Sequence, residues 1–359
     1  MMQPPENGFK PVALLTKEAE ARIVVICRRG TRAGHGHPAW SRSHEGMELE
    51  RSSRATALIF LFALVAIWGG NYTWVKIAVR DIGPWTFNML RYSLAVIFMA
   101  TAFAVLGRAS QLLPRPDERV GLGIVGFLQA AVITTGTALA LQWIEASRVV
   151  LIAYSMPIWT LPLSALILGE RATIVTVAGA VLGLIGLVLL TNPFAVAWTA
   201  ESIPGILISL IAVNGWALGA VLYRRRRWQS TFWQQTFWQL AVTAVVMVPC
   251  AVLFEYGREI RASLPMITIT LYNSLVPTVI GYWCWSQALT RTTATAASQV
   301  LLLSPLFGMV LSHFVLGEPL GTWITLAAAC IVLGAWLSVA GTSAGAATGT
   351  NANGEGVKD

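Results

Sequence analysis

The chain has 359 residues, of which 55% are apolar and only 12% are charged, whereas roughly a quarter are charged in soluble globular proteins. This composition argues against a soluble fold and favours an integral membrane protein. The net charge of +8 comes largely from the N-terminal tail and short loops, since nine of the 25 Lys and Arg residues precede Ala55. Cations placed in this way are typical of the cytoplasmic flanks of membrane spans and do not indicate a nucleic-acid partner.

Residues 1–54 precede the first apolar segment and are rich in Arg, His, Pro and Gly. They show no apolar period, so we predict a basic, disordered tail. Met47 is an alternative start, because the first span begins only eight residues later, at Ala55. His35 and His37 could hold a metal ion weakly, but a solvated tail is the better interpretation.

The four cysteines share no C-x-x-C spacing, so the sequence predicts no metal site and no cofactor.

From Ala55 onward the charges nearly vanish and ten apolar segments follow, each of about the 20 residues that a helix needs to cross a bilayer. The predicted spans are residues 55–79, 84–106, 120–144, 147–168 and 173–190, followed by 204–223, 232–255, 265–288, 295–316 and 320–340. We therefore predict an all-α integral membrane protein with ten transmembrane helices. Residues 341–359 have no apolar run and are predicted to form a flexible C-terminal tail.

A constant offset of 148 residues relates the first five predicted spans to the second five. At this offset a tryptophan, a proline and a Gly-Glu pair recur: Trp68 and Trp216, Pro157 and Pro305, Gly169-Glu170 and Gly317-Glu318. The sequence thus predicts two structural repeats, residues 55–190 and 204–340. Because five is an odd number of spans, the second repeat enters the membrane from the opposite side, and the two repeats are inverted.

Cation counts in the short loops predict the orientation of these spans. If the N-terminus is cytoplasmic, the inner loops carry nine Lys and Arg residues and the outer loops carry five. Together with the basic N-terminal tail, this excess predicts that both termini are cytoplasmic.

Several local motifs together resemble a known family: Trp68-Gly69-Gly70-Asn71 in the first span, residues 87–92 with Leu90-Arg91 in the second, and a proline followed by Gly-Glu in each half. Over residues 55 to about 340 the chain resembles the EamA family of the drug/metabolite transporter superfamily. The resemblance implies two EamA repeats of five helices each. It also implies a bacterial inner-membrane carrier of small metabolites, often amino acids or related compounds, and frequently an exporter. It implies no particular substrate.

Polar side chains within the spans are the candidates for a substrate site, because hydrocarbon penalises them elsewhere. Arg91 lies seven residues into its span, where a cation needs a wet cavity or a partner. It is either a fixed cation for a substrate carboxylate or an arginine tied to helix-end carbonyls. The other substrate-binding candidates are aromatic or amide side chains, each of which could instead form an interhelical hydrogen bond: Trp68, Asn71, Trp216, Gln235, Gln239, Tyr282 and Gln299.

The fourth span of each repeat carries a proline near its middle. Pro157 and Pro305 each free a backbone carbonyl, and we predict either a hinge for alternating access or a static kink at these positions. A carboxylate at a helix start is favoured by the helix dipole and can cap free N–H groups. The residues that end these spans are therefore predicted to be structural: Gly169, Glu170, Gly317 and Glu318.

These observations predict a secondary transporter of the inner (plasma) membrane that exports small metabolites such as amino acids or related compounds. Its expected partners are a small-molecule substrate and the lipid bilayer. Arg91 favours an anionic or zwitterionic cargo, and a multidrug or nucleotide-sugar-type carrier of the same superfamily is the alternative. An integral membrane enzyme is less favoured, because the predicted spans contain one histidine, His313, and no clearly central carboxylate.

Overall fold

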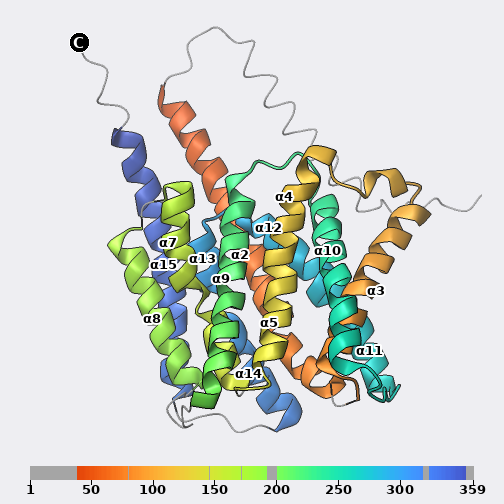
Figure 1. Cartoon of the computed structure of the whole chain (residues 1–359). Coiled ribbons are helices and arrows are strands. Elements are labelled where there is room, and N and C mark those ends of the chain that lie inside the picture. The colour runs from red at the N-terminus through yellow and green to blue at the C-terminus, as the bar shows by residue number, and fades with distance from the viewer. Residues whose placement is uncertain are drawn as a thin grey trace, which may run out of the picture. The chain divides into compact units, whose positions relative to one another are not determined.

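The computed structural model describes residues 39–79, 81–144, 146–170, 172–191, 200–317 and 323–352. The chain divides into two compact units, Met1–Ser52 and Ser53–Asp359, and the apolar spans belong to the second. Within the described residues all regular structure is helical, as Figure 1 shows. The predicted all-α class is confirmed.

In the first half of the chain the third and fourth spans are each built from more than one helical element (Figure 1). The elements are α2 (Ala39–Ala78), α3 (Pro84–Val105), η1 (Ala109–Gln111), α4 (Pro116–Gly126), the π-helical turn η2 (Phe127–Val132), α5 (Ile133–Ala140), α6 (Ala146–Tyr154), α7 (Met156–Leu168) and α8 (Ile174–Thr191).

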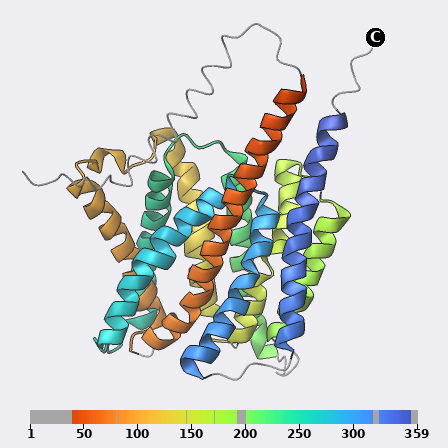
Figure 2. The same cartoon turned by 180° about the vertical axis from the view of Figure 1, so that it is seen from behind.

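The second half repeats this pattern, because its third and fourth spans are again divided. Figure 2 shows the molecule from behind. Its elements are η4 (Ala200–Ser202), α9 (Ile203–Arg225), α10 (Phe232–Glu255), α11 (Leu264–Asn273), the π-helical turn η5 (Ser274–Ile280), α12 (Gly281–Leu289), α13 (Ala294–Leu301), α14 (Leu303–Leu316) and α15 (Ile324–Ala352).

Nine helical segments of the described chain are long and apolar enough to cross a membrane. A shorter apolar helical segment, Ala55–Asn71, lies within α2, in the first predicted span. A multi-pass membrane protein is thus supported, while the count of ten transmembrane helices stays a prediction.

Helices at matching repeat positions pack against each other, α3 against α10 and α8 against α15. The π-helical turns also match, because an offset of 148 residues carries Phe127–Val132 onto residues 275–280, within η5. The α8–α15 contact is close, since a Cβ added to Gly334 would lie 2.6 Å from the backbone nitrogen of Gly183. The main cluster of buried apolar residues draws on both halves and includes Tyr92 and Trp285.

The two terminal helices are longer than the sequence predicted. α2 begins at Ala39 rather than at residue 55, and no proline interrupts the chain between Pro38 and Pro84. α15 continues to Ala352, past the predicted end of the last span at residue 340. Its extension contains no proline, so no residue there lacks the N–H that a continuing helix needs.

Candidate functional site

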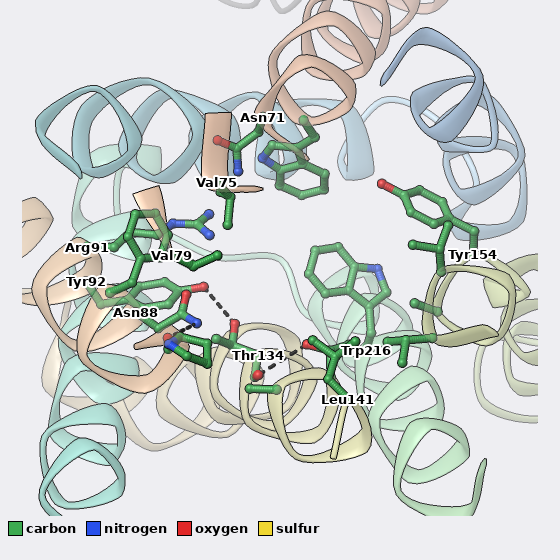
Figure 3. Close-up of a pocket in the computed structure, with 18 of the residues that line it drawn as sticks. Asn71, Val75, Val79, Asn88, Arg91, Tyr92, Thr134, Leu141, Tyr154 and Trp216 are labelled. Carbon is green, nitrogen blue, oxygen red and sulfur yellow. Dashed lines mark hydrogen bonds between the residues drawn. The ribbon is translucent and has the colours of Figure 1, made fainter. Parts of the chain in front are cut away.

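A cavity of about 360 Å³ lies among α2, α3, α5, α6, α9 and α12, so both halves of the chain line it. It extends to the side where α2 joins α3 and α5 joins α6, because its wall includes Val79, Pro84, Leu141 and Val149 at those helix ends. This side is the lower one in Figure 1. The wall is mostly apolar, and a few polar groups converge on it, which is the usual character of a small-molecule site (Figure 3).

Arg91 supplies the charge of this cavity. Among the described residues that line it, Arg91 is the only charged one. Its Nε donates to Thr278 Oγ1 at 2.6 Å, and its guanidinium carbon lies 5.2 Å from the ring centre of Tyr92. Within the described chain, neither contact uses the two Nη nitrogens, and no carboxylate pairs with them. Figure 3 shows the guanidinium directed toward the cavity, so its outer nitrogens can receive an anion.

Four aromatic rings from both halves pack together beside the cavity. Trp68 and Trp216, which occupy matching repeat positions, have ring centres 5.5 Å apart, and Trp285 lies 5.5 Å from Trp216. Tyr282 completes the cluster at 5.8 Å from Trp68. Trp68 Nε1 donates to the carbonyl of Pro277 at 2.9 Å, within the π-helical turn η5.

The hydroxyls of Tyr92 and Tyr282 connect this aromatic cluster to the side of the cavity on which Arg91 lies. Tyr92 Oη lies 2.9 Å from Thr134 Oγ1 and 3.5 Å from Tyr282 Oη. Tyr282 Oη donates to the Gln129 carbonyl at 3.3 Å, within the π-helical turn η2. Both π-helical turns therefore place a backbone carbonyl next to the aromatic cluster. Single π-helical turns within α-helices are often found at functional sites.

Comparison with known proteins places this chain in a family. The model of the EamA-like transporter family matches residues 55–192 and, a second time, residues 203–340. The chain belongs to the EamA-like transporter family. It is therefore a multi-pass membrane transporter, of the family that the sequence motifs resemble.

Individual relatives of this EamA-family chain are distant. The uncharacterized transporter YoaV of Bacillus subtilis is 23% identical over 293 residues, which cover 78% of this chain and 96% of the relative. A protein of Salmonella typhimurium named "Probable amino-acid metabolite efflux pump" is 25% identical over 288 residues, which cover 77% of this chain and 93% of the relative. A crystal structure matches with a TM-score of 0.70 at 20% identity over 79% of this chain and 96% of the other, which shows a shared fold.

Five of the predicted substrate-binding residues of this EamA chain meet at the cavity. They are Arg91, Trp68, Asn71, Trp216 and Tyr282. The Asn71 Oδ1 and Trp216 Nε1 atoms are buried and have no hydrogen-bond partner among the described residues. An acceptor and a donor thus remain unused in the wall.

The three predicted glutamines do not line the cavity. Gln235 accepts a hydrogen bond from the Tyr223 hydroxyl and donates to the Ser230 carbonyl at 2.6 Å, so it joins α9 to the start of α10. Gln239 is buried where α10 packs on Gly126. Gln299 is buried beside Gly183 of α8. Gln235 thus forms the interhelical hydrogen bond that was its alternative. Gln239 Nε2 and both amide atoms of Gln299 have no hydrogen-bond partner among the described residues, so the role of these two side chains stays a prediction.

The two prolines lie just after breaks in their spans. The first break is at Ser155, between α6 and α7, and the second is at Leu302, between α13 and α14. Pro157 and Pro305 therefore sit in the first turns of α7 and α14, where a missing N–H costs little. Ala153 and Tyr154, just before the first break, line the cavity. Whether these breaks act as hinges stays a prediction.

The Gly-Glu pairs end the fourth span of each repeat. Gly169 and Gly317 have φ values of 67° and 69°, a left-handed conformation that glycine adopts without strain at a helix C-terminus. Glu170 accepts from Arg224 Nη1, and this ion pair joins the end of α7 to the end of α9. Glu318 lies outside the described residues.

The opposite side, where α9 joins α10, is closed by contacts between the halves. The buried Glu118 carboxylate of α4 accepts from the backbone N–H groups of Gln229 at 2.6 Å and Ser230 at 2.9 Å. Arg226 pairs with Asp117 at 3.1 Å, and Arg224 pairs with Glu170. No described residue of this network lines the cavity.

Sequence reasoning did not single out several cavity residues, among them Asn88, Tyr92, Thr134 and Tyr154. Tyr92 follows Arg91 directly, within the 87–92 motif, which was an available signal. Thr134 and Tyr154 carried none, because a single hydroxyl in an apolar run is ordinary in membrane helices.

Proposed function

We propose that this EamA-family chain is a secondary carrier that exports small metabolites, such as amino acids or related compounds, across the inner (plasma) membrane. The observation that carries the proposal is the cavity between two halves of the chain, with Arg91 as its charged group. Residues 55–190 and 204–340 are the two inverted repeats in this account. Carriers built from inverted repeats bind substrate near the midplane, between the repeats.

The closed and open sides of the cavity support alternating access. With both termini in the cytoplasm, as the loop cations favour, the cavity extends toward the outside and the α9–α10 side faces the cytoplasm. The conformation is then outward-facing. Return to the inward-facing state requires the contacts of Glu118, Arg224 and Arg226 to separate, and the breaks at Ser155 and Leu302 offer positions for the bending.

Amino-acid-type cargo and export have two sources of support. Arg91 provides a cation that can pair with a substrate carboxylate, as the fork of a guanidinium does well. The Salmonella typhimurium relative carries an amino-acid metabolite efflux name.

A deletion strain tests this function. The strain is challenged with a panel of amino acids and toxic analogues, and both sensitivity and excreted metabolites are measured. The wild-type gene should restore resistance and excretion for at least one carboxylate-bearing compound, and Arg91→Gln, expressed to the same level, should not. Arg108→Gln is the matched control, because Arg108 is an exposed arginine beyond the other end of α3. An identical profile with and without the wild-type gene over the whole panel would contradict the proposal.

A further inference from the structure

The charges around the cavity point to a narrower class of cargo. We infer that the cavity binds an organic monocarboxylate with an apolar body of about the size of a benzene ring and with no ammonium group beside the carboxylate. N-acylated or deaminated relatives of amino acids have this chemistry, whereas free amino acids do not. The inference rests on the proposed carrier function and specifies its cargo.

The charge balance of the wall favours an anion over a zwitterion. Arg91 is the only charged group among the described lining residues, and its contacts with Thr278 and Tyr92 leave its charge uncompensated. Glu255 lies near the start of α3, but its carboxylate accepts from Thr86 N and Oγ1 at 2.8 and 2.7 Å and lies 3.7 Å from Arg258. It does not line the cavity. A bound monoanion would neutralise the site, and a zwitterion would not.

Neutral oxygens in the wall are poor substitutes for a carboxylate as partners of an ammonium. Asn71 Oδ1 is an unused acceptor in the wall, but it is a neutral amide oxygen and cannot balance the charge of an ammonium. The hydroxyls of Tyr92 and Thr134 bond to each other, and Thr137 Oγ1 donates to the Ile133 carbonyl at 2.7 Å. An α-ammonium would also lie within a few ångströms of the Arg91 guanidinium, because its own carboxylate would occupy the Nη nitrogens. Like-charge repulsion in a site of low dielectric would then lower the affinity by about tenfold or more.

The rest of the wall suits an apolar ring. The Trp216 indole lies across the cavity from Arg91, with Leu141 beside it (Figure 3). Trp68 also lines the cavity, with its ring centre 5.5 Å from that of Trp216. Aromatic rings pair favourably in edge-to-face or offset arrangements. The volume of about 360 Å³ accommodates a phenyl group with a short carboxylate-bearing chain.

Four matched ligands test the inference on purified, folded protein by isothermal titration calorimetry. They are 3-phenylpropanoate, L-phenylalanine, 2-phenylethylamine and 3-phenylpropanamide, which share a phenyl ring on a two-carbon linker and differ in their charged groups. We expect 3-phenylpropanoate to bind at least about tenfold more tightly than phenylalanine, and the amine and the amide to bind more weakly still. Equal or tighter binding of phenylalanine would overturn the inference, and so would tighter binding of the amine.

Two variants show whether Arg91 causes the preference. Arg91→Gln should bind the carboxylate and the amide with equal affinity, and Arg91→Lys should retain the preference for the carboxylate, because it keeps the charge. Arg108→Gln should behave as wild type. If Arg91→Gln kept the preference, the inference would fail. Absence of binding by all four ligands to folded wild type would also overturn it, but would leave the carrier function, tested separately by excretion in the deletion strain, unaffected.

Discussion

One added methyl group at Gly281 is predicted to disturb the aromatic cluster beside the cavity. A Cβ at this residue would lie 2.5 Å from Trp68 Nε1, well inside the 3.4–4 Å of ordinary van der Waals contact. In Gly281→Ala the indole must therefore move by roughly 1 Å, and its 2.9 Å hydrogen bond to the Pro277 carbonyl would be lost. Overpacking costs about 1–3 kcal/mol and a lost hydrogen bond about 0.5–1.5 kcal/mol, so we expect a destabilisation of about 2–3 kcal/mol.

The assay is thermal unfolding in detergent, combined with a double-mutant cycle. Trp68→Phe removes the clashing part of the indole, so Gly281→Ala should cost less in that background, with a coupling energy of about 1 kcal/mol or more. Gly123→Ala is the control, because its Cβ would lie 3.6 Å from Trp238 Nε1, an ordinary contact. If Gly281→Ala destabilised the wild type and the Trp68→Phe variant equally, the close packing of Gly281 against Trp68 would be refuted.

Further predictions concern the closed side and the orientation. Glu118→Gln should lower the unfolding free energy by about 1–3 kcal/mol, because one buried backbone N–H loses its acceptor, and chemical denaturation measures this. Glu170→Gln and Arg224→Gln should each cost about 0.5–1 kcal/mol and show coupling in a double-mutant cycle, since the pair is half-buried; additive costs would exclude an energetic pair. A reporter active only in the cytoplasm should be active after Arg227 and silent after Glu201, and reversed signals would overturn the orientation.

The helical architecture could be predicted because its signals extend over the whole chain. Apolar runs of span length and a repeat at one constant offset leave few alternatives for the fold. The ends of the helices were harder to predict. An apolar run shows which residues lie in the membrane, but a helix can continue beyond the membrane. α2 and α15 therefore run past the predicted boundaries, to Ala39 and Ala352.

The site was predictable only in part. The sequence shows how far along its span a residue lies, but it shows less clearly which neighbouring helix or cavity the side chain faces. Arg91 and Asn71 are costly in hydrocarbon, so they mark a cavity. Gln235 and Gln239 carry the same signal but face the packed interfaces of α10. The π-helical turns at Phe127–Val132 and Ser274–Ile280 add to the difficulty, because a widened turn rotates every residue that follows it. No local pattern announced either turn.

Transport by Arg91 variants in proteoliposomes tests most directly whether cargo passes through this cavity. Uptake of radiolabelled 3-phenylpropanoate is measured per folded molecule, with the folded yield determined on the same preparations. The account predicts that Arg91→Gln abolishes uptake, that Arg91→Lys retains part of it, and that Arg108→Gln transports as wild type does. Wild-type uptake per folded molecule by Arg91→Gln, with only its folded yield reduced, would contradict the account and leave Arg91 a structural residue.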